Sequence, residues 1–336
     1  MKIIKDIRKN TIILLLITGI VLFVILKDHF VGIIETIKGM NYIYLFLAII
    51  MYFLYLILKA YIIYLTINEK NKVSFLEAIK HNIITQFFNG ITPFSTGGQP
   101  MEIYMLTEHG ISVGKATSIT VQNFIYYQSA LVIYGIIVVI YNSIFHIFPS
   151  APVLRNLVLL GFVINTLVGI LLFIVTLSTN FTKKVITKLF SWITKLGILK
   201  NKEKLEEKIM LKLQEFHDSA KDIRKRKGLL VKGIVINLIS LTALYIVPLF
   251  IVFGFRDYTN LTVFNTLTAS AYTLLVGSFV PIPGASGGIE YGFIKFFGNF
   301  LSVVPLNSLL LVWRFITYYL AMILGAIIFS IEKKGD

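Results

Sequence analysis

Residues 279 to 293, FVPIPGASGGIEYGF, constrain the fold most, because two prolines and four glycines interrupt an otherwise apolar run. Pro281 and Pro283 remove backbone donors, and the glycines permit conformations that other residues resist. A membrane helix is therefore expected to break here. Non-helical backbone is tolerated at membrane depth only where protein buries it or where it lines a wet cavity, since lipid cannot satisfy its polar groups. The stretch is predicted to line a cavity.

A second copy of this pattern lies upstream at residues 89 to 104, NGITPFSTGGQPMEIY. Both copies contain the spacing Pro-x-x-x-Gly-Gly followed by a carboxylate, and the corresponding residues are Pro93, Gly97, Gly98 and Glu102 in the first copy and Pro283, Gly287, Gly288 and Glu290 in the second. Paired interruptions of this kind point to the binding site of transporters built from inverted repeats. The two breaks are therefore expected to meet near the middle of the membrane.

The composition identifies a membrane protein. Of 336 residues, 56% are hydrophobic and 15% are charged, against ~25% charged residues in soluble domains. The net charge of +15 indicates cytoplasmic loops that face anionic lipid, rather than nucleic-acid binding. The chain has no cysteine, and its five histidines show no metal-binding spacing, so we predict neither a metal nor a cofactor.

The hydropathy pattern predicts an all-α polytopic membrane protein that forms a single integral membrane domain over 1–336. About six full transmembrane helices are expected, at residues 11–26, 41–67, 117–142, 153–177, 229–254 and 305–331. The first is interpreted as a signal anchor. Two re-entrant hairpins, each broken by Pro and Gly, are expected at about 75–115 and 261–303. If the two segments of each hairpin instead cross the membrane completely, the number of transmembrane helices becomes ten.

Charge placement predicts the topology. Residues 180–228 carry fourteen Lys or Arg against six Asp or Glu, which places them in the cytoplasm by the positive-inside rule. Their helical spacing of apolar residues predicts a basic amphipathic connector over 179–228, either solvated on the headgroups or docking a partner or lipid. It separates a first half, 1–178, from a second half, 229–336. The halves, and with them the hairpins, are predicted to be inverted, with both chain termini cytoplasmic.

Arg314 lies well inside the last apolar span, where an arginine costs ~2.5–3.5 kcal/mol on insertion scales. It needs an anionic partner, for which Glu290, Glu102 or a ligand phosphate would serve. A structural pair with Glu290 and a ligand-binding role both remain open. Lys59 either joins the site or extends to the interface, and Glu102 either lines the cavity or lies at headgroup level.

Several uncharged amides lie beside the first break, where they either line the cavity or join helices. The predicted cavity set is Asn89, Pro93, Gly97, Gly98, Gln99, Glu102, Gln122, Pro281, Pro283, Gly287, Gly288, Glu290 and Arg314, with weaker support for Lys59, Gln86 and Gln128. No catalytic constellation is apparent. GISVGKA at 110–116 fails the phosphate-loop pattern, which needs four residues between its glycines and Ser or Thr after the lysine.

Three motifs carry a family resemblance: ITPFSTGGQPMEIYML with the following HGIS, PIPGASGGIEYGF, and WRFITYYL with Gly325 beyond it. In this order and spacing the chain resembles the bacterial lysylphosphatidylglycerol synthase/flippase membrane-domain family. The resemblance implies a plasma-membrane protein that moves an aminoacylated phospholipid between leaflets. In the best-known members a cytosolic domain that charges the lipid is fused to this unit, and no such domain is recognised here. Gly98 to Met101 depart from the synthase-linked pattern, so a different headgroup is expected.

The leading hypothesis is a bacterial lipid translocase whose partners are anionic membrane lipids. Two alternatives stay open. One is a membrane-embedded transferase that acts on lipid, either alone or as part of a phosphatidylglycerol lysyltransferase system. The other is an ion-coupled transporter of small solutes that uses the carboxylates as proton sites. Under the leading hypothesis the chain is expected not to be an enzyme. Assembly into a homo-oligomer is also left open.

Overall fold

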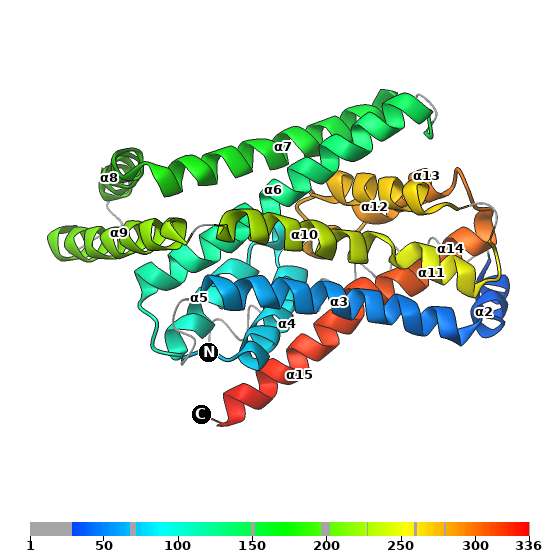
Figure 1. Ribbon diagram of the computed structural model, residues 1–336, viewed down its shortest axis with the longest axis horizontal. Coiled ribbons are helices and arrows are strands. Elements are labelled where there is room, and N and C mark those ends of the chain that lie inside the picture. The colour runs from blue at the N-terminus through cyan, green and yellow to red at the C-terminus, as the bar shows by residue number, and fades with distance from the viewer. Residues whose placement is uncertain are drawn as a thin grey trace.

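The computed structural model describes residues 29–67, 72–148, 152–195, 202–226, 228–258, 261–278 and 280–335, and every regular element among them is a helix (Figure 1). The predicted first span at 11–26 lies outside these residues. The chain is an all-helical, multi-pass membrane protein, as its composition predicted.

Five helices in the described part are long and apolar enough to cross a membrane, and they confirm the other five predicted spans. They are α3 (Tyr42–Thr66), α6 (Val113–Phe145), α7 (Pro152–Leu177), α10 (Leu229–Tyr245) continued by α11 (Val247–Gly254), and α14 (Val303–Arg314) continued by η3 (Phe315–Tyr319) and α15 (Leu320–Gly335). Pro248 lies at the start of α11, where its missing donor is tolerated. The short helix α2 (Phe30–Lys38) was not predicted.

Each Pro/Gly stretch separates two helices, as expected. The first broken unit consists of α4 (Phe75–Ile91), η1 (Pro93–Ser95) and α5 (Gly98–Glu108), and the second of α12 (Val263–Gly277), η2 (Pro283–Ala285) and α13 (Gly288–Phe297). Thr92 and Ile282, which precede the proline that opens each 3-10 turn, are extended, as steric conflict with a following proline favours. The two units therefore share one design: a helix, a tight 3-10 turn and a second helix.

The correspondence between the two broken units continues beyond the breaks. The starts of η1, α5 and α6 recur 190 residues later as the starts of η2, α13 and α14, since Pro93, Gly98 and Val113 correspond to Pro283, Gly288 and Val303. Each broken unit is followed by a long apolar span. The halves thus match in element order and in spacing after the break.

The basic connector forms α8 (Thr179–Lys195) and α9 (Lys202–Lys225). The apolar face predicted for α9 is buried, with Leu213, Phe216, Ala220 and Ile223 inside the protein. It packs against α6 and also contacts α7, α8 and α10. The second connector helix is therefore fixed to the bundle and is not a free solvated arm.

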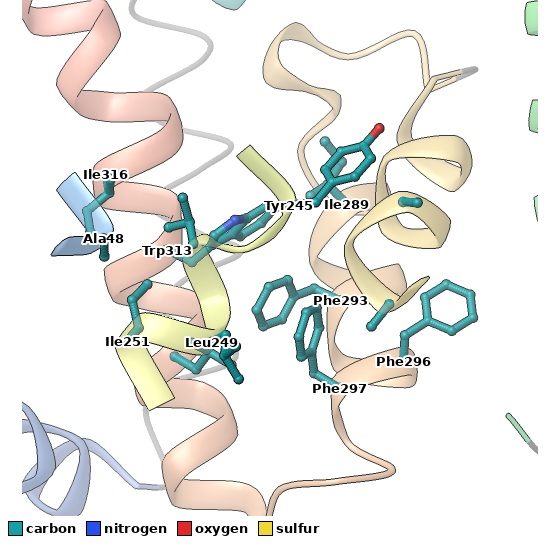
Figure 2. Close-up of a cluster of buried hydrophobic side chains, with 14 of the residues drawn as sticks. Ala48, Tyr245, Leu249, Ile251, Ile289, Phe293, Phe296, Phe297, Trp313 and Ile316 are labelled. Atoms are coloured by element: carbon teal, nitrogen blue, oxygen red, sulfur yellow. The ribbon is translucent and has the colours of Figure 1, made fainter. Parts of the chain in front are cut away.

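An aromatic core joins the second broken unit to the last span (Figure 2). Phe293 of α13 stacks on Phe297 and on Trp313 of α14, with ring centroids 4.3 and 4.6 Å apart. Ile316 and Ala48 lie in the same cluster. Because Arg314 directly follows Trp313, this packing fixes where its guanidinium emerges.

Helix α7 lies at the edge of the bundle and contacts α12 across Gly161 (Figure 1). A Cβ at Gly161 would overlap the backbone carbonyl of Leu275, which cannot move away alone. We expect Gly161→Ala to lower the free energy of unfolding in detergent by about 1–3 kcal/mol. Gly169→Ala is the control, because its Cβ would meet only side-chain atoms of Gln128, the nearest being Cγ at 3.0 Å, and no backbone atom. Equal effects of both changes would contradict this packing.

Candidate functional site

The two helix breaks lie against each other. The turn η1 contacts η2, and α4 contacts η2 as well. The hydroxyl of Tyr318, in the last span, donates a hydrogen bond to the carbonyl oxygen of Gly90 at 2.8 Å. Residues 93–98 and 283–288, which are far apart in sequence, are thus brought together at one place in the bundle.

A buried ion pair lies beside this junction. Arg314 Nη2 is 2.6 Å from Glu290 Oε1, and Arg314 Nε donates a hydrogen bond of 2.8 Å to the same oxygen. Glu290 is 2% exposed and Arg314 3% exposed. Of the anionic partners considered for Arg314, Glu290 is the one that the structure shows paired with it. Because lipid and packed protein both solvate ions poorly, each charge depends on the other.

Backbone groups of the second break form hydrogen bonds with both members of the ion pair. The second oxygen of Glu290, Oε2, accepts a hydrogen bond from the N–H of Gly287 at 2.7 Å, at the positive N-terminal end of α13. Arg314 Nη2 also donates to the carbonyl oxygen of Gly284 at 3.3 Å. The Pro/Gly break therefore supplies both a donor to the carboxylate and an acceptor to the guanidinium.

The guanidinium of Arg314 also lies near aromatic rings. Its Cζ is 5.6 Å from the ring centroid of Trp313 and 5.2 Å from that of Tyr318. The five residues after Arg314, Phe315–Tyr319, form a π-helical turn, which the sequence did not predict. Such turns are rare and frequently mark functional sites. The turn shifts Tyr318 relative to a regular α-helix, next to both Arg314 and Gly90.

Glu102 belongs to a different network. It is buried inside the protein, and its Oε1 accepts a hydrogen bond from Asn123 Nδ2 at 3.4 Å. Asn123 Oδ1 accepts in turn from the Thr66 hydroxyl at 2.7 Å. The Lys59 ammonium lies 4.4 Å from the ring centroid of Tyr127 on α6, the helix that also carries Asn123.

The predicted amides divide by role. Asn89 Oδ1 accepts the N–H of Gly98 at 2.9 Å and so caps the start of α5. Gln128 Nε2 donates to the backbone oxygen and side-chain oxygen of Asn165, at 2.8 and 2.9 Å, so it joins α6 to α7, which is the helix-joining role left open for these amides. Gln86 contacts Asn82 at 3.4 Å. Gln122 is buried on α6.

The remaining predicted residues lie on the two turns. Gly97 donates its N–H to the Thr92 hydroxyl at 2.8 Å. Pro283 and Gly98 are buried, Gly97, Gln99, Gly287 and Gly288 are partly buried, and Pro93 and Pro281 are exposed. Within the part of the chain that the structure describes, no group of three or more His, Asp or Glu side chains is placed to hold a metal ion.

Two comparisons with known proteins extend over most of the chain. A family model described as "Lysylphosphatidylglycerol synthase TM region" matches residues 11–325. A curated protein of Archaeoglobus fulgidus, described as a UPF0104 membrane protein, is 26% identical over 307 residues, which are 87% of this chain and 88% of that protein.

Proposed function

This chain belongs to the lysylphosphatidylglycerol synthase transmembrane-region family, and we propose that it moves a phospholipid with a polar headgroup between the two leaflets of a bacterial plasma membrane. The observation that carries this proposal is the buried pair of Glu290 and Arg314 beside the contact of two helix breaks. Polar and ionisable groups inside a membrane protein commonly mark a substrate path. The substrate class is an anionic or aminoacylated phospholipid.

The proposal includes an arrangement in the membrane. The two broken units are re-entrant hairpins that enter from opposite sides, in an inverted repeat with six full spans. The matching order of elements and the recurring 190-residue spacing, from Pro93 to Pro283 and from Val113 to Val303, support a repeat. The basic residues of α8 and α9 support a cytoplasmic location for the connector and for both termini.

The chemistry of Arg314 suggests how a headgroup is bound. A planar guanidinium fits a phosphate as well as a carboxylate, because both accept two parallel hydrogen bonds. A lipid phosphate at the junction would therefore exchange with Glu290 as the partner of Arg314. The exchange keeps the arginine paired throughout, which avoids the cost of an isolated buried charge. Acyl chains would stay in the bilayer while the headgroup passes the two breaks.

A second candidate function rests on Glu102. This buried carboxylate has an amide, Asn123, as its hydrogen-bond partner, whereas Glu290 has an arginine. A carboxylate without a fixed ion pair inside a membrane protein is a suitable proton carrier. The alternative is therefore an ion-coupled transporter of small solutes. In both proposals the chain catalyses no covalent step.

The test is a leaflet assay on the full chain reconstituted in vesicles. Head-labelled phosphatidylglycerol, aminoacylated phosphatidylglycerol, phosphatidylethanolamine and phosphatidylcholine are compared for wild type, Arg314→Ala and protein-free vesicles. We expect faster exchange of at least one anionic or aminoacylated lipid with wild type, and loss of that excess with Arg314→Ala. Rates equal to protein-free vesicles for every lipid would contradict translocation. Transfer of a chemical group onto lipid by the purified chain would favour the transferase.

A further inference from the structure

A cavity of about 130 Å³ lies between α6, α7, α9 and α10, away from the ion pair. Its polar lining comes from Gln122 on α6, Thr176 near the end of α7, and Arg224 and Arg226 at the end of α9.

Three polar atoms of this lining lack a protein partner. Within the described residues, Gln122 Nε2, Thr176 Oγ1 and Arg226 Nε are buried and make no hydrogen bond. Gln122 is only 4% exposed and Thr176 3% exposed. Buried polar groups almost always have partners, because an unsatisfied one costs about 1–3 kcal/mol. All three atoms can donate, so a group rich in acceptors would satisfy them.

The charge in the cavity wall is held in place. Arg226 Nη1 donates to the carbonyl oxygen of Leu65 at 2.7 Å and Nη2 donates to that of Thr66, at the end of α3. These bonds occupy the outer nitrogens and leave Nε for a ligand. Burial lowers the pKa of the Arg226 guanidinium below its usual value, so a neighbouring anion would offset the cost of its desolvation. The cavity is suited to an anion.

The rest of the lining is apolar and opens toward exposed surface. Phe173 and Leu177 of α7 and Leu230 of α10 line the cavity and are also solvent-exposed in the isolated chain. They continue the apolar surfaces of two spans. The cavity is smaller than the ~300–1,000 Å³ sites that enclose drug-sized ligands. It is large enough for an anionic group while any attached chains remain outside.

We propose that this cavity binds the phosphate of an anionic phospholipid through Gln122, Thr176 and Arg226, with the acyl chains along α7 and α10. The apolar rim favours a lipid over free phosphate, since free phosphate would gain nothing from Phe173, Leu177 and Leu230. The site is distinct from Glu290 and Arg314 and does not depend on translocation. A lipid bound there would also attach the connector helix α9 to the membrane-spanning helices.

The test measures ligand-dependent thermal unfolding of the full chain in detergent. The probes are short-chain phosphatidylglycerol, a diacylglycerol with the same chains, and inorganic phosphate. The variant Gln122→Leu/Thr176→Val removes two of the unpartnered groups with little change in volume. Thr166→Val is the control, because the Thr166 hydroxyl bonds to the Phe162 carbonyl of its own helix. Arg226 is left intact, since it caps α3.

We expect phosphatidylglycerol to raise the unfolding temperature of wild type and of Thr166→Val, and its apparent affinity to fall at least about tenfold in the double variant. Diacylglycerol and inorganic phosphate should be much weaker ligands. Inorganic phosphate acting as strongly as the lipid would contradict the lipid assignment. A lipid effect unchanged in the double variant would place the lipid elsewhere and overturn this site, without bearing on translocation. No lipid effect on wild type would also overturn it.

Discussion

Replacing Arg314 with methionine is expected to lower the free energy of unfolding by about 3–5 kcal/mol, because Glu290 is left as a buried charge without its partner. Methionine fills much of the same space, so the loss reports the charge more than a cavity. The aromatic packing of Trp313 on Phe293 should stay intact. Unfolding by denaturant in detergent, with the signal of the two tryptophans, provides the measurement.

A double-mutant cycle separates structure from transport. Glu290→Gln removes the negative charge and keeps an oxygen that accepts the N–H of Gly287. Glu290→Gln/Arg314→Met should therefore be more stable than Arg314→Met alone, since replacing both charges of a buried pair is often nearly neutral. If Arg314 binds the lipid headgroup, the double variant should be folded yet inactive in the leaflet assay. An active double variant would mean that the ion pair serves stability alone.

The sequence predicted the helix breaks because the responsible chemistry is local. A proline removes a donor wherever it lies, and its effect on the preceding residue appears as the extended Thr92 and Ile282. The pair of Arg314 and Glu290 was predictable for a different reason. A full charge inside an apolar span requires an opposite charge, and few candidates exist in such a chain.

The uncharged contacts could not be predicted in the same way. A side-chain amide can find hydrogen-bond partners in many places. Nothing in the sequence therefore distinguishes Gln128, which joins α6 to α7, from Asn123, which binds Glu102. Asn123 was missed for this reason. The π-helical turn after Arg314 contains Tyr318, whose bond to Gly90 joins segments that are far apart in sequence, and sequence patterns do not report such contacts. The capping of α3 by Arg226 is likewise a long-range contact.

Replacing Gly284 with alanine is expected to be the most damaging single change in the turn between α12 and α13. Gly284 has φ of +65°, in the left-handed region, which costs other residues about 1–2 kcal/mol. Its new Cβ would also overlap the hydroxyl and ring of Tyr318, and overpacking typically costs about 1–3 kcal/mol. Together the two costs predict a loss of about 2–5 kcal/mol in unfolding free energy.

The variant Gly110→Ala measures the cost of placing alanine at positive φ without any steric overlap. Gly110 also has positive φ, +72°, but a Cβ there would meet nothing within 4 Å. It should therefore lose only about 1–2 kcal/mol. Adding Tyr318→Leu to Gly284→Ala removes the overlapping ring atoms, so this double variant should recover part of the difference. Because Tyr318 also donates to Gly90, each broken unit contacts the same ring. Equal losses for Gly284→Ala and Gly110→Ala would show that the two units are not packed together through Tyr318.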